Sequence, residues 1–186
     1  MELLSQQDKK LVRAHDLTFK PFLSEEKILK RVAELGHQIT NDFKGKKLVF
    51  IGILNGAFVF LADLVRACDL SCEITFIKLS SYKGLKSKGK VTTLIGMDID
   101  LKGRDVIVVE DIVDTGKTLY QFLKELKTLE PTSVKLASLL VKPEALQYEI
   151  PVDYKGFDIP NKFVIGYGLD YNGEGRNLKS IYQLAE

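Results

Sequence analysis

The chain has 186 residues, and its 27 Lys and Arg nearly balance its 25 Asp and Glu, which leaves a formal net charge of +2. This length suits one domain around one hydrophobic core, and 45% hydrophobic residues exclude a disordered or collagen-like chain. The balanced charge argues against a nucleic acid or a membrane as partner. The sequence contains no apolar run as long as a membrane span and no signal-peptide pattern at its N-terminus, so we expect a cytoplasmic protein.

The first part of the chain predicts a helix, a strand and a second helix. Ser24 can cap a helix whose apolar residues recur at helical spacing until the chain reaches Gly45. The continuous apolar run Leu48–Leu54 has the length of a strand that is covered on both faces, as in a parallel sheet. After the turn residues Asn55-Gly56, Phe58–Cys68 predicts the second helix.

A lysine-rich segment interrupts the next two predicted strands, Glu73–Tyr82 and Val91–Ile95. Residues Lys83–Lys90 contain four lysines and two glycines and have too little apolar content to pack. Two interpretations are open: a solvated hairpin tip, or a flexible cationic loop that closes over an anionic substrate and excludes water.

The second half of the chain continues the alternation. Val106–Val109 predicts a strand, and the segment Glu110–Gly116 connects it to an amphipathic helix with apolar residues from Leu119 to Leu129. Pro131 ends this helix. Two more strands are predicted, at Val134–Val141 and Phe163–Tyr167. The order of elements indicates an α/β fold, in which sites lie beyond the carboxyl ends of the strands.

The cysteines and histidines do not predict a metal centre. Cys68 and Cys72 have only His15 and His37 as possible co-ligands, and the spacing is not that of a zinc site. We expect the two cysteines to be free thiols.

The segment Glu110–Thr118 carries the clearest chemistry. In its second half, Gly116 permits a tight turn at a helix start, where backbone amides and the hydroxyls of Thr115 and Thr118 can bind a phosphate. In its first half, the adjacent carboxylates of Glu110 and Asp111 would repel a phosphate unless sugar hydroxyls or Mg²⁺ accept them. A phosphorylated sugar satisfies both halves.

Simpler interpretations compete at several positions. Gly116-Lys117-Thr118 also ends a Walker A loop, but that motif needs glycine where Asp111 stands. The segment could also be only a charged connection, although it has more polar residues than a connection needs. Taken alone, Lys142 could be a solvated lysine and Phe163 a core aromatic residue.

At Val106–Thr118 the sequence resembles the type I phosphoribosyltransferases. Their signature is an apolar run, two acidic residues, two apolar residues, Asp, Thr-Gly, Lys or Arg, and Thr, and all of it is present. The resemblance covers most of the chain and narrows to the hypoxanthine-guanine phosphoribosyltransferases through five further motifs. These are Leu54-Asn55-Gly56, Ser81-Tyr82, Leu139–Lys142, Lys162-Phe163-Val164, and Gly168-Leu169-Asp170-Tyr171 with Arg176.

The resemblance implies a fold and a domain organisation. The expected fold is a mainly parallel, twisted sheet flanked by helices. We expect one domain over residues 1–186, with a core at about 25–145. A small hood would come from the N-terminal segment and about 150–186, and a flexible loop, 83–90, would follow Ser81 and Tyr82.

The resemblance also implies an activity: transfer of ribose phosphate from 5-phosphoribosyl diphosphate to hypoxanthine or guanine, with Mg²⁺, giving IMP or GMP in purine salvage. Glu110 and Asp111 would hold the ribose hydroxyls and a metal ion. Asp114, Thr115, Gly116, Lys117 and Thr118 would bind the 5-phosphate. Asp114 would also take the purine N7 proton as general base.

The remaining implied roles concern the purine base and the diphosphate. Lys142 would donate to the purine 6-oxo group and so reject adenine, which offers an amino group there. Phe163 would stack on the ring, the Val164 backbone would meet its edge, and Asp170 would hold a second magnesium. Diphosphate would be bound by Leu54, Asn55, Gly56 and Arg176.

Two departures from the family pattern qualify these expectations. Many relatives have a basic residue at the position of Asn55, so affinity for diphosphate should be lower here. The segment Pro143–Val152 lacks the basic residues that some members carry there, so its subunit contacts should differ from theirs, although the resemblance implies a homodimer or homotetramer. Two alternatives to the transferase activity are open: the chain could be a nucleotide-sensing regulatory protein of the same fold that binds RNA, or it could be an NTPase.

Overall fold

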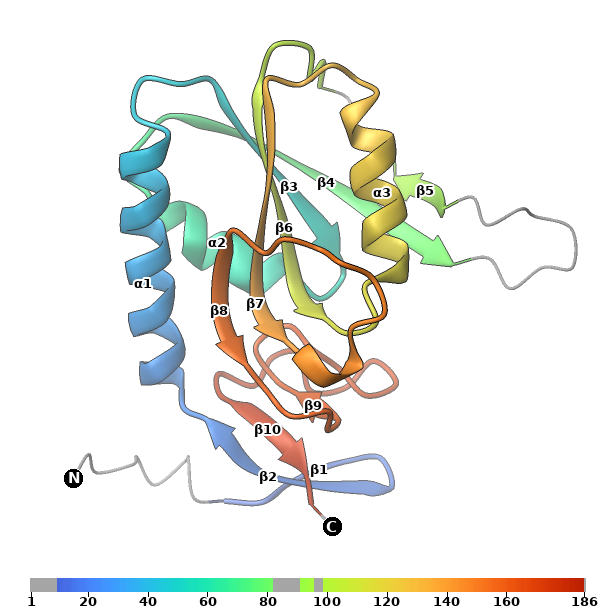
Figure 1. Cartoon of the computed structure of the whole chain (residues 1–186). Coiled ribbons are helices and arrows are strands. Elements are labelled where there is room, and N and C mark those ends of the chain that lie inside the picture. The colour runs from blue at the N-terminus through green and yellow to red at the C-terminus, as the bar shows by residue number, and fades with distance from the viewer. Residues whose placement is uncertain (1–9, 82–90, 96–98, 186) are drawn as a thin grey trace, which may run out of the picture.

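The computed structural model describes residues 10–81, 91–95 and 99–185. They form a large sheet between helices and a smaller sheet at one end of it (Figure 1). The predicted loop Lys83–Lys90, with Tyr82 before it, lies outside the described residues.

The large sheet has the strand order β5-β4-β3-β6-β7-β8. Five of its strands are parallel, and β5 pairs antiparallel with β4. Their bounds are β3 (Leu48–Leu54), β4 (Cys72–Ser81), β5 (Val91–Ile95), β6 (Asp105–Val113), β7 (Ser133–Val141) and β8 (Tyr154–Asp158). The predicted α/β class and the strand Leu48–Leu54 are confirmed.

Helices cover both faces of this sheet, which explains the continuous apolar runs in its strands. One core lies between the sheet and α1 (Glu25–Asp42) with α2 (Phe58–Ala67), and a second core lies under α3 (Lys117–Lys127). Alternate residues of β3 enter the two cores: Phe50 faces the first, and Val49 and Ile51 face the second. Among the described residues, no helix combines the length and apolar content needed to cross a membrane.

The smaller sheet joins the two terminal parts of the chain. Its order is β1-β2-β10-β9, with every pair antiparallel. The strands are β1 (Val12–Ala14), β2 (Leu17–Leu23), β9 (Val164–Ile165) and β10 (Ile181–Leu184). In Figure 1 the parallel strands point towards this sheet, so it stands beyond their carboxyl ends.

Three predicted boundaries were wrong. Strand β6 continues past Val109 to Val113, because Glu110 and Val113 still pair with β7. Helix α3 ends at Lys127 rather than at Pro131, and Leu129 is exposed. The predicted strand Phe163–Tyr167 is reduced to two residues of the smaller sheet, since Gly166 and Tyr167 have positive φ angles and turn the chain.

The close packing of α1 on α2 depends on a residue without a side chain. A Cβ atom on Gly36 would lie 2.6 Å from both the Cβ and the carbonyl oxygen of Ala67. Because one of these atoms is backbone, a side chain rotation cannot relieve the contact.

We therefore predict that Gly36→Ala lowers the free energy of unfolding by about 1–3 kcal/mol, the range for overpacked cores. Urea denaturation measures this change. His37→Ala, at the exposed neighbouring position, is the control and should change the value by less than about 0.5 kcal/mol. A Gly36→Ala variant as stable as the parent would contradict this account of the helix contact.

Candidate active site

An open pocket with a volume of about 360 Å³ lies at the carboxyl ends of β3 and β6. It brings together the predicted site residues of this segment, Glu110, Asp111 and residues 114–118, with four others that were also predicted: Leu54, Gly56, Asp170 and Arg176. Five apolar residues complete the lining: Ile53, Leu79, Ile112, Val113 and Leu119. Of the predicted site residues that the structure describes with their side chains, Asn55, Lys142, Phe163 and Val164 do not line it.

The wall at the start of α3 is built to bind an anion. Gly116 caps the helix with φ 77°, in the left-handed region, and a Cβ atom there would lie 2.6 Å from Ile150 Cδ1. The Gln147 amide donates to the Thr115 carbonyl at 3.1 Å and holds the loop from behind. The first amides of α3 have no partner within the helix and carry its positive dipole end. This wall fits the predicted phosphate site.

The opposite wall carries the adjacent carboxylates. Asp111 Oδ1 accepts a hydrogen bond from the Ile112 amide at 2.9 Å. A Cβ atom on Gly56 would lie 1.6 Å from Asp111 Oδ2, so the turn after β3 leaves room for this carboxylate only because residue 56 is glycine. Glu110 Oε2 is buried and has no hydrogen-bond partner among the described residues.

Burial controls the protonation of both acids. It raises the pKa of Glu110 well above its ordinary value, and the negative charge of Asp111 raises it further. Burial also raises the pKa of Asp111, while its hydrogen bonds and the Arg176 guanidinium act in the opposite direction. A ligand that donates hydrogen bonds or carries positive charge would therefore favour the ionised forms.

The acidic wall fits a magnesium ion that a substrate helps to coordinate. Within the described part of the chain, no three His, Cys, Asp or Glu side chains are grouped to hold a metal ion by themselves. Asp170 instead pairs with Arg176 at 2.7 Å and accepts from the Gly173 amide at 2.7 Å. Mg²⁺ commonly takes one or two carboxylates together with substrate phosphates, and the unpartnered oxygen of Glu110 suits such a role.

Lys142 lies next to this pocket as the partner of Asp114. Its Nζ donates to Asp114 Oδ2 at 3.1 Å, and its side chain is 8% exposed, against 49% for Asp114. The simpler interpretation of Lys142 as a solvated lysine is therefore wrong. The Lys142 amide also donates to the Val113 carbonyl at 2.9 Å, so the end of β7 is attached to the end of β6.

Phe163 and Val164 lie in the smaller sheet region. The side chain of Val164 is buried, but Phe163 is 42% exposed, which excludes its interpretation as a core aromatic residue. The centroid of the Phe163 ring lies 6.1 Å from that of the Phe19 ring and 5.8 Å from that of the Tyr171 ring.

The turn after β3 and the loop before Arg176, both predicted to bind diphosphate, touch each other. A Cβ atom on Gly168 would lie 2.2 Å from the Gly56 carbonyl oxygen, so the turn after β3 and the loop before Arg176 are in backbone contact. Arg176 donates to the Gly168 carbonyl at 2.6 Å as well as pairing with Asp170. The peptide bond between Leu54 and Asn55 is cis.

The apolar pocket residues were missed by sequence reasoning. Leu79 and Leu119 also pack in the second core, so the spacing of apolar residues along β4 and α3 does not distinguish a residue that lines the pocket from one that only fills the core. Of the predicted loop residues, Ser81 ends β4.

With the pocket in view, the comparisons with known proteins decide its family. Residues 20–172 match the phosphoribosyl transferase domain family. The hypoxanthine-guanine phosphoribosyltransferase of Lactococcus lactis is 46% identical over 163 residues, covering 87% of this chain and 88% of the relative. The chain belongs to the hypoxanthine-guanine phosphoribosyltransferases. The resemblance seen in the sequence is thus confirmed.

Other members of this phosphoribosyltransferase family are also similar to the chain in sequence and in structure. The hypoxanthine phosphoribosyltransferase of Escherichia coli is 41% identical over 167 residues, with 88% of this chain and 94% of the relative covered. A crystal structure of a hypoxanthine phosphoribosyltransferase from Staphylococcus aureus has a TM-score of 0.85 at 36% identity and covers 99% of this chain and 97% of its own. The predicted type I phosphoribosyltransferase fold and the transferase class of the enzyme are confirmed.

The buried acid Glu110 predicts a pH dependence of stability in the ligand-free protein. Its pKa is raised above the ordinary 4.5, so between these two values the folded state binds more protons than the unfolded state. Stability from this group is therefore full below pH 4.5 and falls as the pH rises towards the folded pKa.

Replacing Glu110 by Gln should remove this dependence. Urea denaturation from pH 4 to 8 should show Glu110→Gln becoming progressively more stable relative to the parent as the pH rises. For Glu125→Gln, at an exposed site on α3, the difference in free energy of unfolding from the parent should be the same at every pH. If the Glu110→Gln difference were also constant, Glu110 would not be a buried acid with a raised pKa.

Proposed function

We propose that this enzyme transfers the 5-phosphoribosyl group of 5-phosphoribosyl diphosphate to N9 of hypoxanthine or guanine, forming IMP or GMP and releasing diphosphate in purine salvage. One observation carries the proposal: a single pocket joins a phosphate-type helix terminus to the paired carboxylates Glu110 and Asp111. The relatives named for this activity support the choice of reaction.

The ligand groups can be assigned to the two walls of the pocket. The amides and hydroxyls from Thr115 to Thr118 would bind the 5-phosphate, and Glu110 and Asp111 would accept hydrogen bonds from the ribose hydroxyls. Magnesium would be held by these carboxylates together with substrate oxygens, and Asp170 would hold a second ion. When bound, magnesium supplies charge neutralisation on the departing diphosphate.

Asp114 and Lys142 have the arrangement needed to recognise an oxopurine. In hypoxanthine and guanine the 6-oxo group and N7 lie on the same edge of the ring. An ammonium and a carboxylate 3.1 Å apart can meet that edge together, with Lys142 donating to the oxygen and Asp114 accepting the N7 proton. As N9 attacks the anomeric carbon, the N7 proton moves to the Asp114 carboxylate, whose charge also stabilises an oxocarbenium-like transition state.

The remaining contacts come from the smaller sheet region and the turn after β3. Phe163 has an exposed ring that can stack on the purine, and the Val164 backbone would meet its Watson-Crick edge. Diphosphate would bind at the amides of Leu54-Asn55-Gly56, with Arg176 as the cation. Arg176 would have to share its guanidinium between Asp170 and the diphosphate, since it is paired with Asp170 at 2.7 Å.

We propose further that residues 1–186 act as one domain in which the small sheet is a hood over the pocket. We also propose a cytoplasmic homodimer or homotetramer. Exposed apolar side chains on α2 and β4, namely Phe58, Ile74 and Phe76, support self-association. Light scattering after size exclusion tests the assembly.

The reaction itself is tested with the purified chain, 5-phosphoribosyl diphosphate and Mg²⁺, by assaying hypoxanthine, guanine, xanthine and adenine in parallel. Nucleotide formation from hypoxanthine or guanine is the expected result. Failure with every oxopurine would overturn the proposal, and ATP hydrolysis without a purine would favour an NTPase.

Asp114→Asn tests the general base. Asparagine keeps an oxygen that can accept from Lys142 but cannot take the N7 proton, so kcat should fall about 100- to 10,000-fold. The Kd for 5-phosphoribosyl diphosphate, measured by calorimetry, should change little. An unchanged kcat would remove Asp114 from the proton transfer.

Lys142→Met tests the choice of base. Loss of the ammonium should lower kcat/KM for hypoxanthine by about 10- to 100-fold, the range for a hydrogen bond from a charged donor. Activity with adenine should not fall in parallel, so the ratio between the two bases should narrow. Lys124→Met, on the exposed face of α3, should leave that ratio unchanged. An unaltered ratio in Lys142→Met would show that Lys142 does not read the 6-position.

A further inference from the structure

Two tyrosines hold the loop that carries Asp170, and each is bound by an aspartate from a different part of the chain. Tyr167 donates its hydroxyl proton to Asp63 Oδ2 of α2 at 2.6 Å. Tyr171 donates to Asp16 Oδ1 at 3.0 Å, and Asp16 lies in the turn between β1 and β2. Asp170 is therefore placed between two attachment points, one on α2 and one in the N-terminal hairpin.

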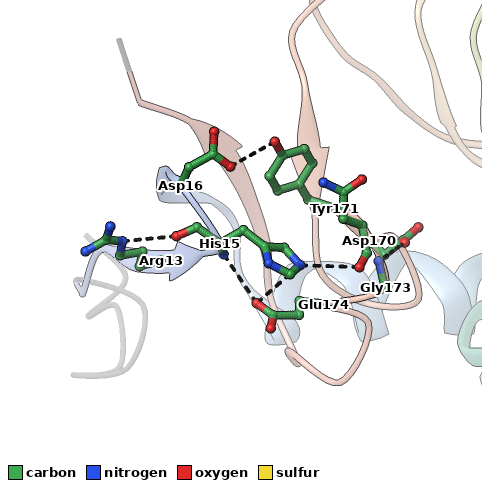
Figure 2. Close-up of polar contacts among 8 residues, drawn as sticks. Arg13, His15, Asp16, Asp170, Tyr171, Gly173 and Glu174 are labelled. Carbon is green, nitrogen blue, oxygen red and sulfur yellow. Dashed lines mark hydrogen bonds and ion pairs between the residues drawn. The ribbon is translucent and has the colours of Figure 1, made fainter.

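The attachment to the hairpin turn is reinforced by His15, as Figure 2 shows. The His15 amide donates to Glu174 Oε2 at 3.3 Å, and its Nε2 lies 3.3 Å from the Asn172 carbonyl oxygen. Its ring meets the Tyr171 ring edge to face, with centroids 5.7 Å apart. The turn thus contacts three residues of the loop: Tyr171, Asn172 and Glu174.

On the side that faces the pocket, the loop is also held by bonds between its own residues. Asp170 accepts from the Gly173 amide and pairs with Arg176, and Arg176 donates to the Gly168 carbonyl. Movement of Tyr171 would therefore be passed to its neighbour Asp170 and through the ion pair to Arg176.

Tyr171 also connects the hairpin turn to Phe163. Its ring lies 5.8 Å from the Phe163 ring at 80°, and 6.5 Å from the ring of Phe19, which is fully buried. Phe163 is 42% exposed, and its ring packs against two aromatic neighbours, Tyr171 and Phe19. The orientation of Phe163 depends on where Tyr171 is held.

From these contacts we infer that Asp16 is a positioning residue of the purine site: through the Tyr171 hydroxyl it fixes the Phe163 ring and the loop from Asp170 to Arg176. This inference rests on the proposed function in one respect, the stacking of the base on Phe163. The 5-phosphate loop has no part in these contacts, and Asp170 and Arg176 are also held by their ion pair, the Gly173 amide and the Gly168 carbonyl. The effect on the base should therefore exceed the effect on 5-phosphoribosyl diphosphate.

The kinetic test uses three variants that change one bond in different ways. Asp16→Ala removes the acceptor, Tyr171→Phe removes the donor but keeps the ring, and Asp16→Asn keeps an acceptor oxygen. The first two should raise KM for hypoxanthine about 2- to 10-fold, as expected for one lost hydrogen bond, with a smaller change in KM for 5-phosphoribosyl diphosphate. Asp16→Asn should stay near the parent.

A double variant separates coupling from two unrelated effects. Asp16→Ala combined with Tyr171→Phe should raise KM for hypoxanthine no more than either change alone. Multiplied effects, equal changes in both KM values, or an unchanged KM for hypoxanthine would each overturn the assignment.

A bond of the same kind elsewhere provides the matched control. Tyr154 donates to Asp42 Oδ2 at 2.7 Å, at the amino end of β8 and away from the pocket. Tyr154→Phe should lower thermal stability without altering KM for hypoxanthine. A rise in that KM equal to the one in Tyr171→Phe would mean that general destabilisation, not positioning, explains the result.

Hydrogen–deuterium exchange tests the inference independently of turnover. Peptides over residues 163–176 should exchange faster in Asp16→Ala and Tyr171→Phe than in the parent, Asp16→Asn or Tyr154→Phe. Unchanged exchange in the first two would overturn the positioning role even if the kinetics changed. If the parent protein used no oxopurine, the proposed function would fail, while this measurement would still decide whether Asp16 holds the loop.

Discussion

The pocket depends on the continued pairing of β6 with β7 beyond the apolar part of the sheet. The ladder pairs Glu110 with Ser138 and Val113 with Val141, so the acidic residues stand on a hydrogen-bonded strand rather than on a loop. A strand restricts the backbone far more than a loop does, which suits groups that must meet a ligand at fixed positions. After Val113, only Asp114, Thr115 and Gly116 remain before α3 begins at Lys117.

This geometry places opposite electrostatic fields within one small volume. The start of α3 attracts negative charge, whereas Glu110 and Asp111 repel it, and burial of the two acids makes their ionisation unfavourable without a partner. A ligand with a phosphate at one end and hydroxyls or a cation near the other relieves both conditions. The ligand-free site is therefore the less stable arrangement of these charges, as is common where binding energy is used in catalysis.

How far the sequence predicts this architecture varies with the element. Strand β3 and helix α1 were predicted closely, because long apolar periodicity and a capping serine are local signals. The ends of β6 and α3 were misplaced, because polar residues can pair in a ladder when a neighbouring strand is available, and a helix can end before the residue that would break it. Strands β1, β2, β8 and β10 were missed, since they are short or exist only through distant partners, as with Ile181 paired to Leu23.

In the candidate site, too, features with a local sequence signal were predicted and features that depend on distant residues were not. The motif at Glu110–Thr118 was readable because adjacent carboxylates followed by Thr-Gly are chemically unusual, and the structure brings its two halves into one pocket. The pairing of Lys142 with Asp114 joins residues 28 positions apart and could not be derived from either residue. The apolar pocket residues and the role of Asp16 carry no local signal.

Backbone contact between two glycines explains why separate motifs act as one site. Gly56 leaves space for the Asp111 carboxylate, and Gly168 leaves space for the carbonyl of Gly56 itself. A side chain at either position would separate the turn after β3 from β6 or from the loop that holds Asp170 and Arg176. Strand β6, the turn after β3 and the loop after Tyr167 are thus packed in series, and the position of each limits that of the next. The terminal strands belong to the same series through the hydrogen bond from Tyr171 to Asp16, so the smaller sheet is attached to the loop that carries Asp170.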